Sequence, residues 1–192
     1  MKSNNIIAQR LLVMVLTVAV CVTMLGNSSR VSAASAYQIK INKQQNCVTI
    51  YKSGANGKYK PVKAMVCSTG YATPVGTFPL GEKMRWHTLM GPCYGQYCTR
   101  IHGGILFHSV WYYKQTPSSL SASAYNKLGV TASHGCVRLS VADAKWIYDN
   151  VPSGSPVTVY NSSNPGPLGK PSAIKLPSSS TWDPTDVWSS GN

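Results

Sequence analysis

The sequence predicts a mainly β fold, a sandwich of short mixed strands with one short helix late in the domain. Three observations support this class. Short runs rich in β-branched residues recur, and turn residues interrupt them at intervals of about ten residues. Only residues 141–150 combine a capping signal with a helical apolar pattern. The region 37–160 has the length of a single domain.

Residues 1–36 have the pattern of a secretory signal peptide. Lys2 and Arg10 supply a positive start, and residues 11–25 form an apolar run that is short for a membrane span. Small residues at 31–36 offer cleavage sites. An uncleaved N-terminal anchor is the alternative. We therefore expect a protein that is secreted from the cytoplasm.

The first strands are expected at residues 37–41 and 47–51, where apolar residues alternate or β-branched residues cluster. The polar residues between them favour a hairpin. A third strand is expected at residues 59–67, and Pro61 near its start predicts an edge position. Residues 73–78 form a Gly- and Pro-containing loop that opens another short strand.

The middle of the domain is harder to assign. Residues 84–104 show neither a helical nor a strand period, so we expect a long loop over the domain. Residues 104–111 are typical of an apolar strand, in which His108 is embedded. One turn of helix is expected at residues 125–129.

The last elements of the domain are a helix and a strand. Ser140 is expected to cap the helix at residues 141–150, with Asp143 as its reciprocal partner. Residues 156–160 form a closing strand. Residues 161–192 are rich in Ser, Pro, Gly and Asn, so we expect a flexible tail there.

A reactive centre is predicted at residues 133–138, Ser-His-Gly-Cys-Val-Arg. A thiolate is a strong nucleophile, but a free thiol is mostly protonated at neutral pH. If the segment is extended, His134, Cys136 and Arg138 share one face, because residues two apart point the same way. The N–H groups of Gly135 and Cys136 suit a developing oxyanion. Alternatively, Cys136 is a buried apolar residue.

His108 is the candidate general base. Taken alone, a His in an apolar strand is more often a core residue with satisfied hydrogen bonds than a catalyst. The presence of a candidate nucleophile in the same domain favours catalysis, because a sandwich of short strands can bring the two side chains together.

Four further cysteines follow the predicted signal, and export permits disulfides. We expect Cys93–Cys98, which are close in sequence, and Cys47–Cys67, which lie on neighbouring predicted strands. These pairings leave Cys136 as a free thiol. The alternative is a zinc site, whose ligands would be Cys93, Cys98, His102 and His108. Their spacing matches no structural zinc site, so we expect neither a metal nor a cofactor.

The composition is strongly basic, with 18 Lys and Arg against 5 Asp and Glu and a net charge of +13. The basic residues form no run of about five or six, so nucleic-acid binding is not expected. A basic exported protein is equally expected to be held near anionic cell-surface polymers by long-range attraction.

Four motifs together resemble the L,D-transpeptidase catalytic domain of the YkuD type. They are Ser68-Thr69-Gly70, Thr73-Pro74-x-Gly76-Thr77-Phe78, Phe107-His108-Ser109 and Ser133-His134-Gly135-Cys136-Val137-Arg138. The resemblance covers residues 37–160 and keeps the family's order, including the helix and the last strand. It implies the family's β-sandwich and a bacterial enzyme that remodels peptidoglycan in cell-wall biogenesis and the maintenance of cell shape.

Mapped by motif, the resemblance implies that Cys136 is the nucleophile and His108 the general base, which later acts as the acid. Ser109 would orient the imidazole through its backbone carbonyl. The thiol attacks the third residue of a tetrapeptide stem and expels D-alanine. A side-chain amine of a second stem resolves the thioester, which gives a 3→3 cross-link. Carbapenems, which acylate this family, are expected to label Cys136.

The same mapping assigns the remaining residues of the signature. Gly135 and Cys136 would hold the oxyanion with help from His134, in a loop that includes Ser133. Arg138 would support this loop or bind a substrate carboxylate. The segment between His108 and Ser133 is longer than the family's usual gap, so we expect an insert or lid.

Other functions remain open at this point. An L,D-carboxypeptidase would use water as the acceptor on the same acyl-enzyme, and a non-catalytic secreted wall-binding module would keep only the fold. The expected partners are peptidoglycan stem peptides, as donor and as acceptor, for a monomer located in the cell wall.

Overall fold

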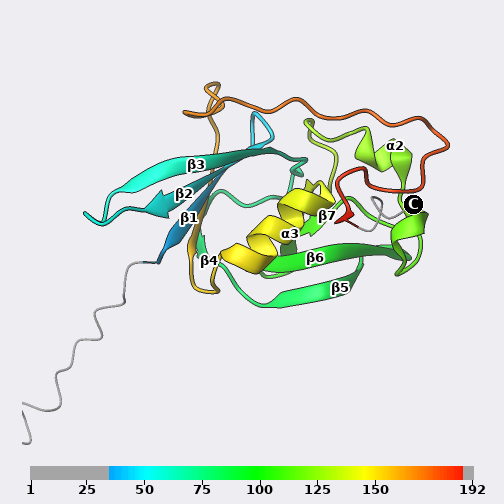
Figure 1. Ribbon diagram of the computed structural model, residues 1–192, viewed down its shortest axis with the longest axis horizontal. Coiled ribbons are helices and arrows are strands. Elements are labelled where there is room, and N and C mark those ends of the chain that lie inside the picture. The colour runs from blue at the N-terminus through cyan, green and yellow to red at the C-terminus, as the bar shows by residue number, and fades with distance from the viewer. Residues whose placement is uncertain (1–34, 188–192) are drawn as a thin grey trace, which may run out of the picture. The chain divides into compact units, whose positions relative to one another are not determined.

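The computed structural model describes residues 35–187, and the predicted signal therefore lies almost wholly outside the described residues. One sheet has the order β3-β2-β1-β9-β4, and the other has the order β5-β6-β7-β8 (Figure 1). The mainly β class predicted from the sequence is confirmed. In the described part, no helix is long and apolar enough to cross a membrane.

The first sheet contains β1 (Tyr37–Asn42), β2 (Cys47–Ser53), β3 (Tyr59–Val66), β4 (Gly76–Pro79) and β9 (Pro156–Tyr160). The second contains β5 (Lys83–Leu89), β6 (Cys93–His102), β7 (Ile105–Ser109) and β8 (Val137–Leu139). The helical segments are η1 (Pro117–Ser119), α2 (Ala122–Tyr125) and α3 (Val141–Asn150).

The strands of the first sheet follow the alternation of their residues. Ile39 and Ile41 of β1 are fully buried, because every second side chain of a strand faces the core. Strand β1 pairs with β2 as the predicted hairpin and runs parallel to β9. Strand β3 is at the edge of the sheet, as Pro61 predicts.

The prediction of a long loop at residues 84–104 is wrong, because this region forms the hairpin of β5 and β6. Strand β6 explains part of the failure. The φ of Tyr97 is +49°, which is rare for a residue other than glycine, and all of residues 95–99 of β6 are buried, so the strand shows no alternation of apolar and polar positions. Strand β5 in turn has no fully buried side chain, which removes the apolar signal.

The predicted helix at residues 141–150 is confirmed as α3. The Ser140 hydroxyl accepts a hydrogen bond from the Asp143 N–H at 3.3 Å, which caps the first turn. Helix α3 packs on β6 and β7, and Tyr148 meets Tyr97 edge to face at 5.5 Å between ring centroids. The other short helix, α2, spans Ala122–Tyr125 and overlaps the predicted residues 125–129 only at Tyr125.

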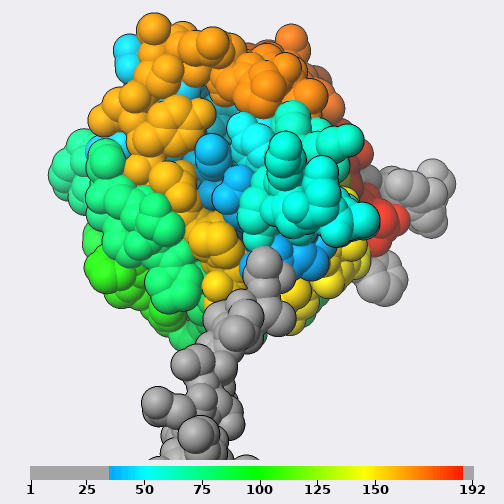
Figure 2. Space-filling view, turned by 90° about the vertical axis from the view of Figure 1, so that its left-hand side faces the viewer, coloured from blue at the N-terminus to red at the C-terminus, as the bar shows by residue number. Residues whose placement is uncertain are grey.

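Residues 161–187, which we call the C-terminal strap, differ from the predicted flexible tail. The strap lies along the domain in extended form, and its first part is drawn in orange in Figure 2. The Asn126 side chain donates to the Leu176 carbonyl at 2.8 Å and accepts from the Leu176 N–H at 2.7 Å. Polar contacts of this kind hold a segment that has few apolar residues.

The end of the strap caps helix α3. The Asp183 side chain is fully buried, and its carboxylate accepts from the Val141 N–H at 2.8 Å. The Thr185 hydroxyl accepts from the Ala142 N–H at 3.0 Å. Both N–H groups belong to the first turn of the helix, which leaves them without partners inside the helix.

Replacing Asp183 with alanine is expected to lower the free energy of unfolding by about 1–3 kcal/mol, because a buried N–H loses its acceptor and the helix loses a negative charge at its N-terminus. Urea unfolding measures this change. The control is Asp149→Ala, which removes an exposed carboxylate that pairs with Lys145. Equal stability of the two variants would contradict the capping role.

Candidate active site

A cavity of about 600 Å³ lies along β7 and the loop before β8. Its walls include Cys136, His108 and Arg138, and also Ser133, His134 and Gly135. Strands β7 and β8 run parallel, with His108 directly opposite Arg138, which explains why two segments far apart in sequence meet here. The structure thus brings six of the predicted site residues to one cavity.

The His108 imidazole is held in one orientation by its neighbour. Its Nδ1 lies 2.6 Å from the Ser109 carbonyl oxygen, so Nδ1–H donates to this carbonyl and Nε2 is left as the proton acceptor. Burial lowers the pKa of His108 to about 4, and the positive charge of Arg138 acts in the same direction, whereas the Ser109 contact opposes it. The imidazole is therefore neutral at pH 7.

The Ser109 hydroxyl does not face the cavity. It accepts from the Gln96 N–H at 2.9 Å and donates to the Val110 carbonyl at 2.9 Å. Ser109 therefore contacts His108 through its backbone, while its side chain joins β7 to β6.

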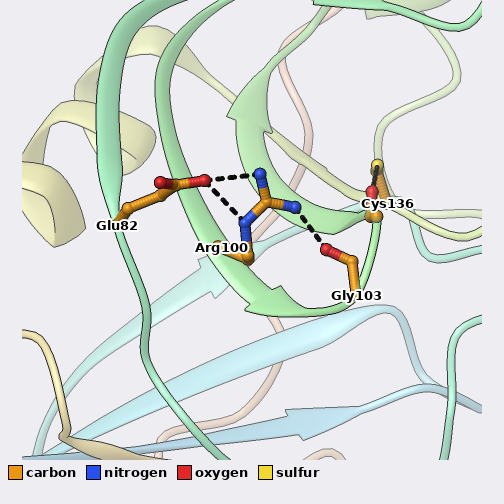
Figure 3. Close-up of polar contacts among 5 residues, drawn as sticks. Glu82, Arg100, Gly103 and Cys136 are labelled. Atoms are coloured by element: carbon orange, nitrogen blue, oxygen red, sulfur yellow. Dashed lines mark hydrogen bonds and ion pairs between the residues drawn. The ribbon is translucent and has the colours of Figure 1, made fainter.

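The Cys136 thiol is half-buried and donates to the Gly104 carbonyl, with 3.7 Å between sulfur and oxygen (Figure 3). Burial raises the pKa of Cys136 above its usual value, while a hydrogen bond from the Leu106 backbone and the charges of Arg138 and Arg100 oppose this rise. The resting thiol is therefore protonated at neutral pH.

Arg100 holds the turn that contacts the thiol. Its guanidinium pairs with Glu82, with 2.8 Å between Nε and the carboxylate oxygen, and donates to the Gly103 carbonyl (Figure 3). Gly104, the next residue, provides the carbonyl that Cys136 contacts. The ion pair is largely exposed, so its contribution is to the position of the turn rather than to stability.

The resting state of the site is thus a neutral thiol and a neutral imidazole in the walls of one cavity. Such a pair transfers its proton while the sulfur attacks, since the charge that develops raises the pKa of the imidazole. This arrangement suits acyl transfer by a cysteine nucleophile with a histidine base.

Arg138 is the one Lys, Arg, Asp or Glu side chain in the described walls of the cavity, so the cavity has a positive and no negative charge of these types. Arg138 donates from Nη1 to the Ala132 carbonyl at 2.8 Å, and it pairs with no carboxylate in the described residues. The guanidinium of an arginine has five N–H donors, so others remain for a ligand. A substrate with a carboxylate would complement this wall.

Gly95 of β6 makes room for His108. A Cβ built on Gly95 would lie 3.0 Å from His108 Nδ1 and 3.2 Å from Cys98 Sγ, closer than ordinary contact. Tyr97, which lies between Gly95 and Cys98 in the chain, has a positive φ of 49°. Burial raises the pKa of the Cys98 thiol to about 12, so it is a protonated, apolar neighbour.

Replacing Gly95 with alanine is expected to lower kcat by about 10- to 100-fold, because the new methyl group displaces the imidazole from its contact with Ser109. Steady-state kinetics measure the change. Gly54→Ala is the control, since its Cβ would meet nothing closer than 3.4 Å. An unchanged kcat in the Gly95→Ala variant would show that His108 does not depend on the absence of a side chain at residue 95.

Neither predicted disulfide is present, and all four cysteines are free. Cys93 and Cys98 lie on the same strand, five residues or about 16 Å apart, which exceeds the reach of a disulfide. Cys47 is directly opposite Val66, so Cys67 is one residue out of register.

The zinc alternative also fails geometrically. In residues 35–187, no three His, Cys, Asp or Glu side chains converge as a metal site would require. Cys93 lies in the cavity wall and Cys98 near His108, whereas Cys47 belongs to β2 of the other sheet and Cys67 directly follows β3.

Some residues of the site were given no role by the sequence. Gly95 comes from a region without periodicity, and Gly70 and Thr73 were recognised only as parts of motifs. A Cβ on Gly70 would lie 2.5 Å from the Gly135 nitrogen, so only glycine fits beside the loop of Cys136. The spacing of the motifs indicated that Gly70 and Thr73 belong to the site. It did not indicate which residues their side chains and backbones contact.

Comparison with known proteins agrees with this geometry. Residues 36–159 match the YkuD family, described as the L,D-transpeptidase catalytic domain. A Bacillus subtilis (strain 168) protein named "Putative L,D-transpeptidase YciB" is 37% identical over 118 residues, which are 56% of this chain and 58% of that protein. The chain thus spans less than two thirds of this relative.

Solved structures share the fold. An L,D-transpeptidase from Mycobacterium tuberculosis H37Rv is 28% identical with a TM-score of 0.50, over 66% of this chain and 58% of that one. An L,D-transpeptidase from Mycobacterium smegmatis is 23% identical with a TM-score of 0.52, over 66% of this chain and 59% of that one.

Proposed function

The chain belongs to the YkuD family of L,D-transpeptidase catalytic domains, and from this premise we propose that it forms 3→3 cross-links in peptidoglycan through a thioester on Cys136. The observation that carries the proposal is the neutral pair of Cys136 and His108 in one cavity, with the imidazole fixed by Ser109.

In the first half-reaction, Cys136 Sγ attacks the carbonyl carbon of the third residue of a tetrapeptide stem. The thiol proton passes to His108 Nε2, and the carbonyl oxygen becomes an oxyanion facing the N–H groups of Gly135 and Cys136. The tetrahedral intermediate collapses when D-alanine leaves with the proton from His108. A thioester remains on Cys136.

In the second half-reaction, the side-chain amine of another stem attacks the thioester carbonyl. His108 accepts the amine proton, and the second tetrahedral intermediate expels the sulfur, which recovers a proton from His108. One amide bond is broken and one is formed, so the exchange needs no cofactor and no external energy source.

Arg138 is proposed to bind a carboxylate of the stem peptide. Its remaining donors and the absence of acidic groups from the described cavity wall support this role. The exposed side chains of Tyr71 and Met90 at the cavity would contact the apolar parts of the substrate.

We propose export by the N-terminal signal and action at the cell wall. The supporting observations are the pattern of residues 1–36 and the excess of basic over acidic residues, 18 against 5, which favours anionic wall polymers.

The test is product analysis after incubation with a disaccharide-tetrapeptide, by liquid chromatography and mass spectrometry. The proposal predicts a 3→3 dimer and free D-alanine. Tripeptide without dimer would make the protein an L,D-carboxypeptidase, in which water is the acceptor. Binding of peptidoglycan with no product would make it a wall-binding module.

A further inference from the structure

Residues 68–73 form a backbone template for the loop that carries Cys136. The Thr69 carbonyl accepts from the N–H groups of Ala132 at 3.0 Å and Ser133 at 3.1 Å, and Ser68 exchanges two backbone hydrogen bonds with Arg138, each of 2.9 Å. The loop is therefore tied to the template before and after the nucleophile.

Between these ties, two successive carbonyl groups of the loop are held by the end of the template. The Ala72 N–H donates to the His134 carbonyl at 3.0 Å, and the Thr73 hydroxyl donates to the Gly135 carbonyl at 2.7 Å. The same hydroxyl accepts from the Gly70 N–H at 2.8 Å, and Thr73 is buried. Its position is thus fixed from both sides.

Each of these carbonyls shares a planar trans peptide with the next N–H, which points the opposite way. Holding the His134 carbonyl therefore orients the Gly135 N–H, and holding the Gly135 carbonyl orients the Cys136 N–H. Within residues 35–187, neither N–H donates a hydrogen bond to the protein. These are the two groups assigned above to the oxyanion.

We propose that Thr73 is a positioning residue of the oxyanion site, whose hydroxyl turns the Gly135–Cys136 peptide so that the Cys136 N–H faces the developing charge. Ser133 supports the far side of the nucleophile, because its hydroxyl donates to the Cys136 carbonyl at 2.5 Å. The inference rests on the proposed function, since an oxyanion forms only when Cys136 attacks a carbonyl.

The test compares Thr73→Val with Thr73→Ser. Valine keeps the shape of threonine but removes the hydroxyl, whereas serine retains it. We expect Thr73→Val to slow acylation of Cys136 by a carbapenem about 10- to 100-fold, somewhat less than the loss of an oxyanion donor itself. Thr73→Ser should restore most of the rate. Intact mass spectrometry at timed intervals measures both.

A second reaction separates positioning from structural damage. Iodoacetamide alkylates the thiol at a saturated carbon, which forms no oxyanion, so its rate and pH profile should be the same in Thr73→Val and in the unchanged protein. The control variant is Thr99→Val in β6, where a buried hydroxyl has no hydrogen-bond partner. It should leave acylation and alkylation unchanged.

The results distinguish the two proposals. The positioning role is wrong if Cys136 is acylated as fast in Thr73→Val as in Thr99→Val. It is also wrong if the rates of acylation and alkylation fall in equal proportion in Thr73→Val. In both cases the proposed function stands. If the unchanged protein is acylated neither by a carbapenem nor by a tetrapeptide stem, the proposed function fails and the role of Thr73 fails with it.

Discussion

Replacing Cys136 with alanine is expected to abolish acyl transfer, with a loss of the order of 10⁶-fold, as when the nucleophile of a covalent mechanism is removed. No other group described in the cavity is placed to take its part. The thiol of Cys93 lies in the same wall, but burial raises its pKa and its contact is with the Met90 carbonyl.

The fold of the Cys136→Ala variant should remain intact. The sulfur is half-buried and makes only weak hydrogen bonds, with the Gly104 carbonyl and the Leu106 backbone, so the free energy of unfolding should change by less than about 1 kcal/mol. Cys93→Ala is the matched control and should still form an acyl adduct. Near-normal turnover by Cys136→Ala would remove Cys136 from the role of nucleophile.

Replacing His108 with glutamine is expected to lower kcat/KM by about 10²- to 10⁴-fold, because the variant lacks the imidazole that accepts the thiol proton during attack. The rate that remains should rise about tenfold per pH unit toward the raised pKa of Cys136, since only the thiolate then reacts. The unchanged protein should show a plateau at neutral pH. Initial rates measured against pH test this difference.

The matched control is His102→Gln, which replaces an exposed imidazole that stacks on Phe78 outside the cavity. It should keep the plateau. A plateau that also persists in the His108→Gln protein would contradict the role of His108 as the base.

Burial of His108 also makes a prediction about stability. Its pKa is about 4 in the folded protein against 6.5 when unfolded, so the unfolded chain binds the extra proton between these values. Stability is therefore full above pH 6.5 and falls as the pH drops toward 4, by up to about 3 kcal/mol from this group. Urea unfolding at several pH values should show this decrease, and His108→Gln should lack it.

Much of the fold could be predicted from the sequence because its residues alternate regularly. The buried Ile39 and Ile41 identified β1, and Ser140 with Asp143 located the start of α3. The β5–β6 hairpin was not predicted because residues 95–99 of β6 are all buried and no residue of β5 is fully buried, so neither strand alternates between apolar and polar residues.

The C-terminal strap was misjudged for a related reason. Its composition is that of a flexible chain, and the groups that order it are single polar side chains elsewhere in the sequence, such as Asn126. The composition of a segment shows how few apolar residues it has, but it does not show which residues elsewhere in the chain will form hydrogen bonds with it.

The sequence motifs predicted the main residues of the candidate site, but the contacts that hold these residues in place could not be predicted from the sequence. The nucleophile, the base and the oxyanion donors were assigned from a specific signature, and the structure places Cys136 and His108 in one cavity. The supporting contacts of Gly95 and Thr73 required the fold, because they join residues that are between 13 and 62 positions apart.

The most direct measurement for this account is the intact mass of the protein after incubation with a disaccharide-tetrapeptide and acid quenching, followed by peptide mapping. The account predicts an added acyl group, equal to the substrate less D-alanine, on the peptide that contains Cys136. No adduct should appear in Cys136→Ala. An adduct on another residue, or products formed without any covalent intermediate, would contradict the thioester mechanism.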